Sequence, residues 1–324
     1  MLRFRIAAFL LIASLAFADE IQFSGIVTGF VLDASSSSIR PILGVPGAAM
    51  LGSPVAQDID AAEIAPGGDR AVVSKGGRLH LLSGLRSGSP AWTPISGISK
   101  ADKVTWNSAG SAAALYSSDT GALLLIRIPG DGSLEELSLD VASLGSAMGP
   151  ILVDRDGRYL VAMTASEPAT LYVLDRQSAP KPIAQFDRPG PMSFAGKERD
   201  VLVADANRGQ IVLIQDVFGA AGALSFGSLP DGVTTPVGLA VSPDETHAFV
   251  ADKASKRIAV YEMGTRNVID QIPLDAEPAF VKRFSRDSLF LLNSGASGNE
   301  PFQLLETGDK PSVYFVPAGA TQSQ

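Results

Sequence analysis

Residues 236–275 read PVGLAVSPDETHAFVADKASKRIAVYEMGTRNVIDQIPLD, and this stretch decides the fold. It contains four short runs rich in β-formers, separated by turn residues. The runs are Leu239–Val241, Ala248–Asp252, Ile258–Tyr261 and Val268–Ile272. Between the first two, Ser242-Pro243-Asp244 is typical of a tight turn, because proline presets φ and aspartate bonds the backbone ahead.

The same order of runs recurs along the chain. Equivalent turn positions lie 42, 47, 41, 47 and 43 residues apart, at Ala65, Asn107, Asp154, Ala195, Ser242 and Ser285. Four strands in every 40 to 50 residues are the repeat of a β-propeller blade. No amphipathic helix separates the runs, so a parallel sheet is disfavoured. The sequence predicts an all-β protein, a β-propeller of four-stranded antiparallel blades.

Six units are complete, and a partial one precedes them. We assign Gly29–Asp33 and Ile39–Leu43 to its third and fourth strands, and Glu20–Phe23 to its second. The prediction is seven blades with an incomplete first blade; six blades plus an extra hairpin is the alternative. Val313–Val316 could close the ring or form the outer strand of the last blade. Residues 317–324 are expected to be a flexible tail.

The unit at 236–275 resembles the YVTN-type bacterial β-propeller repeat. The resemblance rests on Pro236, the Ser242-Pro243-Asp244 turn, Phe249–Asp252, Ile258–Tyr261 and Val268–Ile272. The usual Tyr-Val-Thr-Asn is here Phe-Val-Ala-Asp, and Pro-Asp-Gly is Pro-Asp-Glu. A looser match runs through Val203–Asn207. The resemblance implies a propeller architecture over most of the chain and carries no activity, because this fold serves many functions.

The N-terminus has the pattern of an export signal. Arg3 and Arg5 precede an uncharged apolar run, Ile6–Ala18, which ends in Ala16-Phe17-Ala18. That order predicts a signal peptide at 1–18 rather than a membrane span, which needs about 20 residues. A buried N-terminal element is the alternative. We therefore expect a single propeller domain at 19–316, in a secreted or periplasmic protein without a membrane span.

The composition excludes several classes of chemistry. The 324 residues include no cysteine and two histidines, with 34 acidic against 26 basic residues and a net charge of −8. Absence of cysteine removes disulfides and thiolate sites. No cluster of basic residues suggests a nucleic-acid partner. We expect no catalytic residues, no metal and no cofactor.

Four features imitate functional motifs. Ser178-Ala179-Pro180-Lys181 fits Ser-x-x-Lys, but its prolines indicate a turn. Asp154-Arg155-Asp156-Gly157 resembles a calcium loop, yet it lacks further acids at the required spacing. His80 and His247 belong to different blades, and no third histidine could complete a site with them. Each is interpreted as structural.

The topology predicts where a ligand would bind. Loops after the second and fourth strands of each blade share one face, here called the loop face. Its candidate ligand-binding residues are Asp205, Asn207, Arg208, Asp252, Lys253, Lys256, Asn293 and Asn299. Nearby loops add Ser117, Ser118, Asp119, Thr164 and Glu167. The alternative is that Asp and Asn after a second strand cap the hairpin through backbone bonds.

Two functions remain open. The first is an exported, non-catalytic binding or scaffold module that recognises a protein, peptide or glycan on the loop face. The second is a lactonase-like propeller hydrolase, which would need a converging acid and base, usually with a metal, at the central channel.

Overall fold

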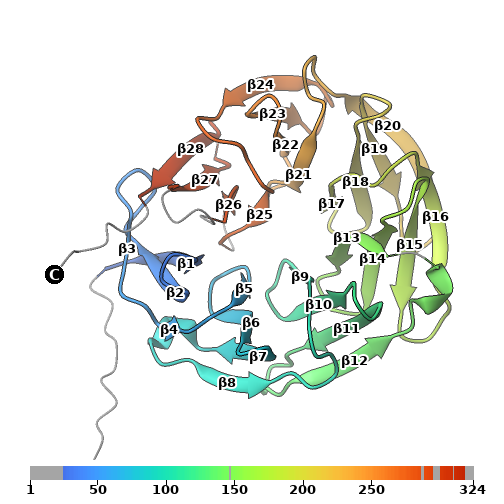
Figure 1. Ribbon diagram of the computed structural model, residues 1–324. Helices are drawn as coiled ribbons and strands as arrows, with labels where there is room; N and C mark the ends of the chain where they lie inside the picture. The colour runs from blue at the N-terminus through green and yellow to red at the C-terminus, as the bar shows by residue number, and fades with distance from the viewer. Residues whose placement is uncertain (1–24, 146, 286–287, 295–299, 309, 318–324) are drawn as a thin grey trace, which may run out of the picture.

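The computed structural model describes residues 25–145, 147–285, 288–294, 300–308 and 310–317. The chain is all-β, and its strands form seven four-stranded antiparallel sheets arranged as the blades of a propeller (Figure 1). The predicted signal peptide, the strand expected at Glu20–Phe23 and Asn299 lie outside the described residues. Among the described residues, no helix is long and apolar enough to cross a membrane.

Six blades follow one plan, with four consecutive strands paired in order. In Figure 1 the first strand of each lies nearest the centre and the fourth lies on the rim. The second blade comprises β5 (Ala61–Ile64), β6 (Arg70–Lys75), β7 (Arg78–Ser83) and β8 (Ala91–Pro94), and the third comprises β9 (Lys103–Trp106), β10 (Ala112–Ser117), β11 (Ala122–Arg127) and β12 (Glu135–Leu139). The fourth comprises β13 (Met148–Val153), β14 (Tyr159–Thr164), β15 (Ala169–Asp175) and β16 (Lys181–Phe186).

The remaining three regular blades complete the ring. The fifth comprises β17 (Met192–Ala195), β18 (Asp200–Asp205), β19 (Gln210–Gln215) and β20 (Gly222–Ser228), and the sixth comprises β21 (Pro236–Val241), β22 (His247–Asp252), β23 (Arg257–Glu262) and β24 (Val268–Pro273). The seventh comprises β25 (Lys282–Arg283), β26 (Leu289–Leu291), β27 (Phe302–Glu306) and β28 (Ser312–Val316). Of the two roles considered for Val313–Val316, the structure gives it the outer strand of this last blade, paired with β27.

The first blade is built differently. It consists of β1 (Val27–Asp33), β2 (Ser38–Leu43), β3 (Met50–Leu51) and β4 (Ala56–Gln57). Both β3 and β4 pair with the side of β2 away from β1, so together they act as one interrupted outer strand. The assignment of Ile39–Leu43 as a fourth, outer strand is therefore wrong, because that strand has partners on both sides. β1 and β2 match second and third strands, and within the described residues the blade has no first strand.

The hydrophobic core is divided among the interfaces between blades. Strand side chains alternate between the two faces of each sheet, so each sheet packs against both neighbours. One cluster, for example, joins Leu79 and Leu81 of β7 to Leu115 of β10 and Leu124 of β11. Because every blade contributes to two clusters, the ring is stabilised as a closed unit.

The ring closes between the seventh and first blades by the same kind of packing. Phe284, Phe302 and Leu304 pack against Val31 and Ile42. The phenyl ring of Phe284 lies so close to Gly29 that a Cβ atom there would stand 2.4 Å from it. Glycine is therefore required at position 29 by close approach.

The two ends of the ring carry different connections. Turns after first and third strands, such as 154–158 and 176–180, form the turn face. Connections after second and fourth strands, such as 206–209 and 253–256, form the loop face opposite. One short 3-10 helix lies at each face, Leu85–Ser87 (η1) in the second blade and Ala142–Leu144 (η2) between the third and fourth.

Candidate functional site

Asp252 is the last residue of β22 at the loop face, and its carboxylate accepts hydrogen bonds from other groups of the protein. The residue is fully buried. One carboxylate oxygen accepts the backbone N–H of Thr235 at 2.5 Å, and the other accepts the N–H and hydroxyl of Ser255 at 2.8 and 2.7 Å. Asp252 thus fixes two loops of the loop face, a role that matches the capping alternative.

Asp205 occupies the equivalent position at the end of β18. It is buried, and its Oδ1 accepts the backbone N–H of Arg208 at 3.2 Å. The Arg208 guanidinium lies 3.5 Å from Asp205 and 3.5 Å from Asp187, with about half of its side chain exposed. Asn207 is exposed in the same loop. This loop therefore offers Asn207 and Arg208 to solvent above a buried carboxylate.

Asn293 is likewise buried, and its side-chain amide forms hydrogen bonds within the protein. Its Oδ1 accepts the N–H of Gln303 at 2.9 Å, and its Nδ2 donates to the carbonyl of Pro301 at 2.9 Å. Lys253 and Lys256 are exposed, and Lys253 lies 3.6 Å from Glu277. Lysine side chains rather than amide groups are thus the accessible polar groups here.

The supplementary residues of the loop face also bond to nearby groups of the protein. Asp119 pairs with Lys100 at 2.8 Å, and Ser118 donates to Asp102. Thr164 is buried and accepts the N–H of Thr170. Ser117 is buried, and Glu167 is exposed. All described candidates share the predicted face, but no hydrogen bond or ion pair in the described part of the chain joins candidates of different loops.

The two histidines belong to different blades, as the sequence predicted, with His80 on β7 and His247 on β22. The His80 ring packs edge-on against Trp92 with centroids 5.6 Å apart. His247 Nδ1 lies 2.8 Å from the Thr246 hydroxyl. Within the described ranges, no group of three or more His, Asp or Glu side chains is placed to hold a metal ion.

Sequence reasoning missed an ion pair near the centre of the ring. Lys282 of β25 lies 2.6 Å from Glu63 of β5, although the two are 219 residues apart in sequence. Glu63 keeps 25% of its side chain exposed, and Lys282 keeps 42%. Burial raises the pKa of Glu63, and the charge of Lys282 opposes that rise. The pair links blades two and seven, which flank the first blade in the ring.

Two further cations lie on first strands. Burial lowers the pKa of Arg283, and the negative charge of Glu198 acts against this. Lys103 of β9 donates to the carbonyls of Met148 and Gly149 on β13, and burial lowers its pKa. Lys103, Lys282 and Arg283 are thus three cations carried by first strands.

At the turn face, acidic side chains tie neighbouring blades together. Glu198 accepts a hydrogen bond from the Ser108 hydroxyl of the third blade and another from the Arg155 N–H of the fourth. Glu245 of the sixth blade accepts the N–H of Lys197 in the fifth. These bonds hold the ends of four consecutive blades in fixed relation.

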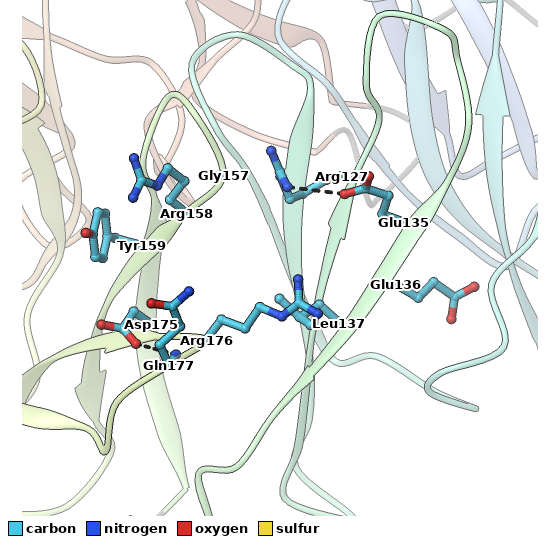
Figure 2. Close-up of a pocket in the computed structure, with 10 residues that line it drawn as sticks. All are labelled: Arg127, Glu135, Glu136, Leu137, Gly157, Arg158, Tyr159, Asp175, Arg176 and Gln177. Atoms are coloured by element: carbon cyan, nitrogen blue, oxygen red, sulfur yellow. Dashed lines mark hydrogen bonds and ion pairs between the residues drawn. The ribbon is translucent and has the colours of Figure 1, made fainter.

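A pocket of about 590 Å³ opens at the turn face between the third and fourth blades (Figure 2). It is lined by Arg127, Glu135, Glu136, Leu137, Gly157, Arg158, Tyr159, Asp175, Arg176 and Gln177. Neither Arg158 nor Arg176 was expected from the sequence. The pocket forms where two blades meet, and no local sequence motif predicts it.

Comparison with known proteins supports the fold. No family model matches the chain, and no curated protein matches it. Among solved structures, a candidate 6-phosphogluconolactonase from Bacteroides fragilis is 12% identical, covers 90% of this chain and 95% of its own, and has a TM-score of 0.61.

Two other solved structures give a similar result. Virginiamycin B lyase from Staphylococcus aureus is 11% identical, with a TM-score of 0.54. The match covers 79% of this chain and 84% of the lyase chain. The Cps50 (Swd1) β-propeller domain from Myceliophteria thermophila is 13% identical, with coverages of 84% and 95% and a TM-score of 0.53. Such low identities show the fold alone, so the YVTN type stays a prediction. The chain has a seven-bladed β-propeller fold.

Proposed function

We propose that this protein is an exported, non-catalytic binding or scaffold module that contacts a protein, peptide or glycan through its loop face. The observation that carries the proposal is that the buried polar groups of the loop face form hydrogen bonds within the protein. Asp252 and Asn293 bond their own loops and so hold the backbone of the loop face in one arrangement. A preformed surface loses little conformational entropy when a partner binds.

The exposed groups of this face fit a macromolecular contact. Asn207, Arg208, Lys253 and Lys256 are exposed, and acidic partners such as Asp187 and Glu277 lie beside two of them. Mixed charges of this kind favour orientation and specificity in a protein or glycan interface.

Site-specific photo-crosslinking tests which face binds. A crosslinker at Asn207 should capture a discrete partner from the extracellular or periplasmic fraction. The same group at Asp131, an exposed position on the turn face, is the matched control. Equal capture from both positions would contradict the assignment to the loop face.

Hydrolysis of a lactone is the second candidate. Near the centre of the ring, Glu63 provides a carboxyl group of raised pKa for a general acid, and Lys282 beside it provides a cation for an anionic substrate. The likeness to candidate 6-phosphogluconolactonases supports the same idea.

Turnover assays separate the two functions. For a binding module, we expect no hydrolysis of 6-phosphogluconolactone, other lactones or phosphoesters by the purified protein, and no stoichiometric metal by elemental analysis. Turnover that Glu63→Gln abolishes would replace the binding proposal with the hydrolase.

We also propose export with cleavage after Ala18. The basic start, the short apolar run and Ala16-Phe17-Ala18 support it. N-terminal sequencing of the exported protein should begin at Asp19. Mature material that retains Met1 would refute the proposal.

A further inference from the structure

The pocket between the third and fourth blades lies on the turn face, so it is separate from the surface proposed above. Figure 2 shows Arg158, Asp175, Arg176 and Gln177 on one side. Arg127, Glu135 and Leu137 come from the neighbouring blade on the other side.

The carboxylates that line this pocket are already engaged. Asp175 accepts the N–H groups of Gln177 and Ser178, both at 2.6 Å, and the Ser178 hydroxyl at 2.7 Å. Glu136 turns away to the backbone N–H groups of Ser96 and Gly97. Glu135 pairs with Arg127 at 3.2 Å.

Arg158 and Arg176 differ from these side chains. Both are exposed, and within the described part of the chain neither forms an ion pair. In Figure 2 the Arg176 side chain extends across the pocket toward Leu137. Arg176 thus reaches across the pocket without a carboxylate to neutralise it, and the Arg158 guanidinium lies over the ring of Tyr159, another residue of the pocket wall, 5.6 Å from the ring centroid.

Both arginines sit on turns of fixed shape. Asp154 Oδ1 accepts the N–H groups of Arg158 and Tyr159 at 2.7 and 2.8 Å. Gly157 has a φ of 62° and packs against Arg127, where a Cβ would stand 3.4 Å from the Arg127 side chain. Asp175 fixes the turn that carries Arg176 in the same way. The backbone of both turns is therefore fixed before a ligand arrives.

We propose that this pocket binds a small organic anion, with Arg158 and Arg176 as its principal contacts. A volume of about 590 Å³ lies in the range typical of small-molecule sites. The planar guanidinium fork matches a carboxylate or a phosphate through paired hydrogen bonds. Leu137 supplies an apolar wall, and Gln177 supplies an additional polar group.

Titration calorimetry at low ionic strength tests the proposal with citrate and inorganic phosphate as probes. We expect one site per chain, and affinity at least tenfold weaker in the Arg158→Gln/Arg176→Gln double variant. Binding of citrate alone identifies a carboxylate ligand, and binding of phosphate alone identifies a phosphorylated one.

Arg188→Gln is the matched control, because Arg188 is an exposed arginine on the loop face. It should bind both probes as the wild type does, and all variants should melt within about 2 °C of the wild type because the substituted side chains are exposed. No binding of either probe, or equal affinity in the double variant, would overturn the site. Binding of a hexaglutamate peptide alone would replace the small anion with an acidic protein segment.

A second variant tests the direction of the effect. Glu135→Gln removes the carboxylate that pairs with Arg127, and so leaves a third guanidinium available to the anion. We expect affinity to rise severalfold. Unchanged or weaker affinity would contradict the role given to the pocket's cations.

Discussion

Asp33, Asp205 and Asp252 occupy the same position in three blades, at the end of a second strand, and all three are buried. Asp33 Oδ1 accepts the N–H and hydroxyl of Ser35, and Oδ2 accepts from Ser36 and Arg40. For Asp205 and Asp252, the sequence left open both a ligand-binding role and a capping role. The observed bonds are those of caps, because each carboxylate accepts a backbone N–H from the loop that follows its own strand, and Asp252 also accepts the N–H of Thr235 from a neighbouring loop.

Asp33 gives a prediction for stability in acid. Burial raises its pKa, but the hydrogen bonds from Ser35, Ser36 and Arg40 together lower it from 3.8 to about 2. The folded state therefore favours the charged form, and this stabilisation is complete above the unfolded pKa and disappears as the pH falls toward 2. We expect Asp33→Asn to cost about 1–2 kcal/mol at pH 7 and much less near pH 2.

Urea unfolding across this pH range measures the effect. Asp231→Asn, at an exposed position, is the control and should leave the stability at pH 7 unchanged. A loss for Asp33→Asn that is the same at pH 7 and pH 2 would contradict the link to ionisation.

Gln303 gives a second residue-level prediction. Its side chain is fully buried, and within the described residues neither its Oε1 nor its Nε2 has a hydrogen-bond partner. Burial of an unpaired amide costs free energy, so Gln303→Met, which keeps the length of the side chain, should raise stability by about 1–2 kcal/mol. Thermal unfolding measures this, and Gln303→Glu should lower the melting temperature. A lower melting temperature for Gln303→Met would mean that the amide is satisfied.

At the scale of elements, the four runs predicted in the unit 236–275 correspond closely to β21, β22, β23 and β24. The first blade was misassigned because its outer strand consists of Met50–Leu51 and Ala56–Gln57, two pieces of two residues each. A piece so short cannot show alternation. Without that strand, the sequence alone made β2 seem to be the edge of the blade.

The ion pair between β5 and β25 was also beyond sequence reasoning, because it joins residues 219 positions apart. We expect Lys282→Met to destabilise the ring by about 1–3 kcal/mol, since it leaves the partly buried Glu63 without its cation. Glu63→Gln with Lys282→Met should recover part of this loss. A double-mutant cycle by urea unfolding should give a coupling of about 1 kcal/mol or more, whereas additive effects would show that the pair does not join the blades.

At the scale of the whole molecule, the repeat predicted the number of blades and their antiparallel order. The pocket between the third and fourth blades was not predictable, because its walls meet only when the ring is assembled. Arg127 and Arg176 belong to different repeats, and each alone is an ordinary turn or strand-end arginine. Local patterns thus specify the blades, while the sites depend on how the blades meet.

The closed ring leads to the last prediction. Removal of all residues after Glu277 deletes the seventh blade and uncovers Phe249 and Ile258 on one side of the gap. On the other side it uncovers Val31 and Ile42, and it also removes the Lys282–Glu63 pair. Because each blade packs against both neighbours, exposure of two interfaces should destabilise all the remaining blades together.

We therefore expect the truncated chain to show no cooperative melting transition by circular dichroism. Removal of residues 318–324 alone is the control, and it should leave the transition unchanged because the deletion keeps β28 and its pairing with β27. A truncated chain without the seventh blade that melts as sharply, and at the same temperature, as the full protein would show that the blades are stable independently. Ring closure would then contribute nothing to stability.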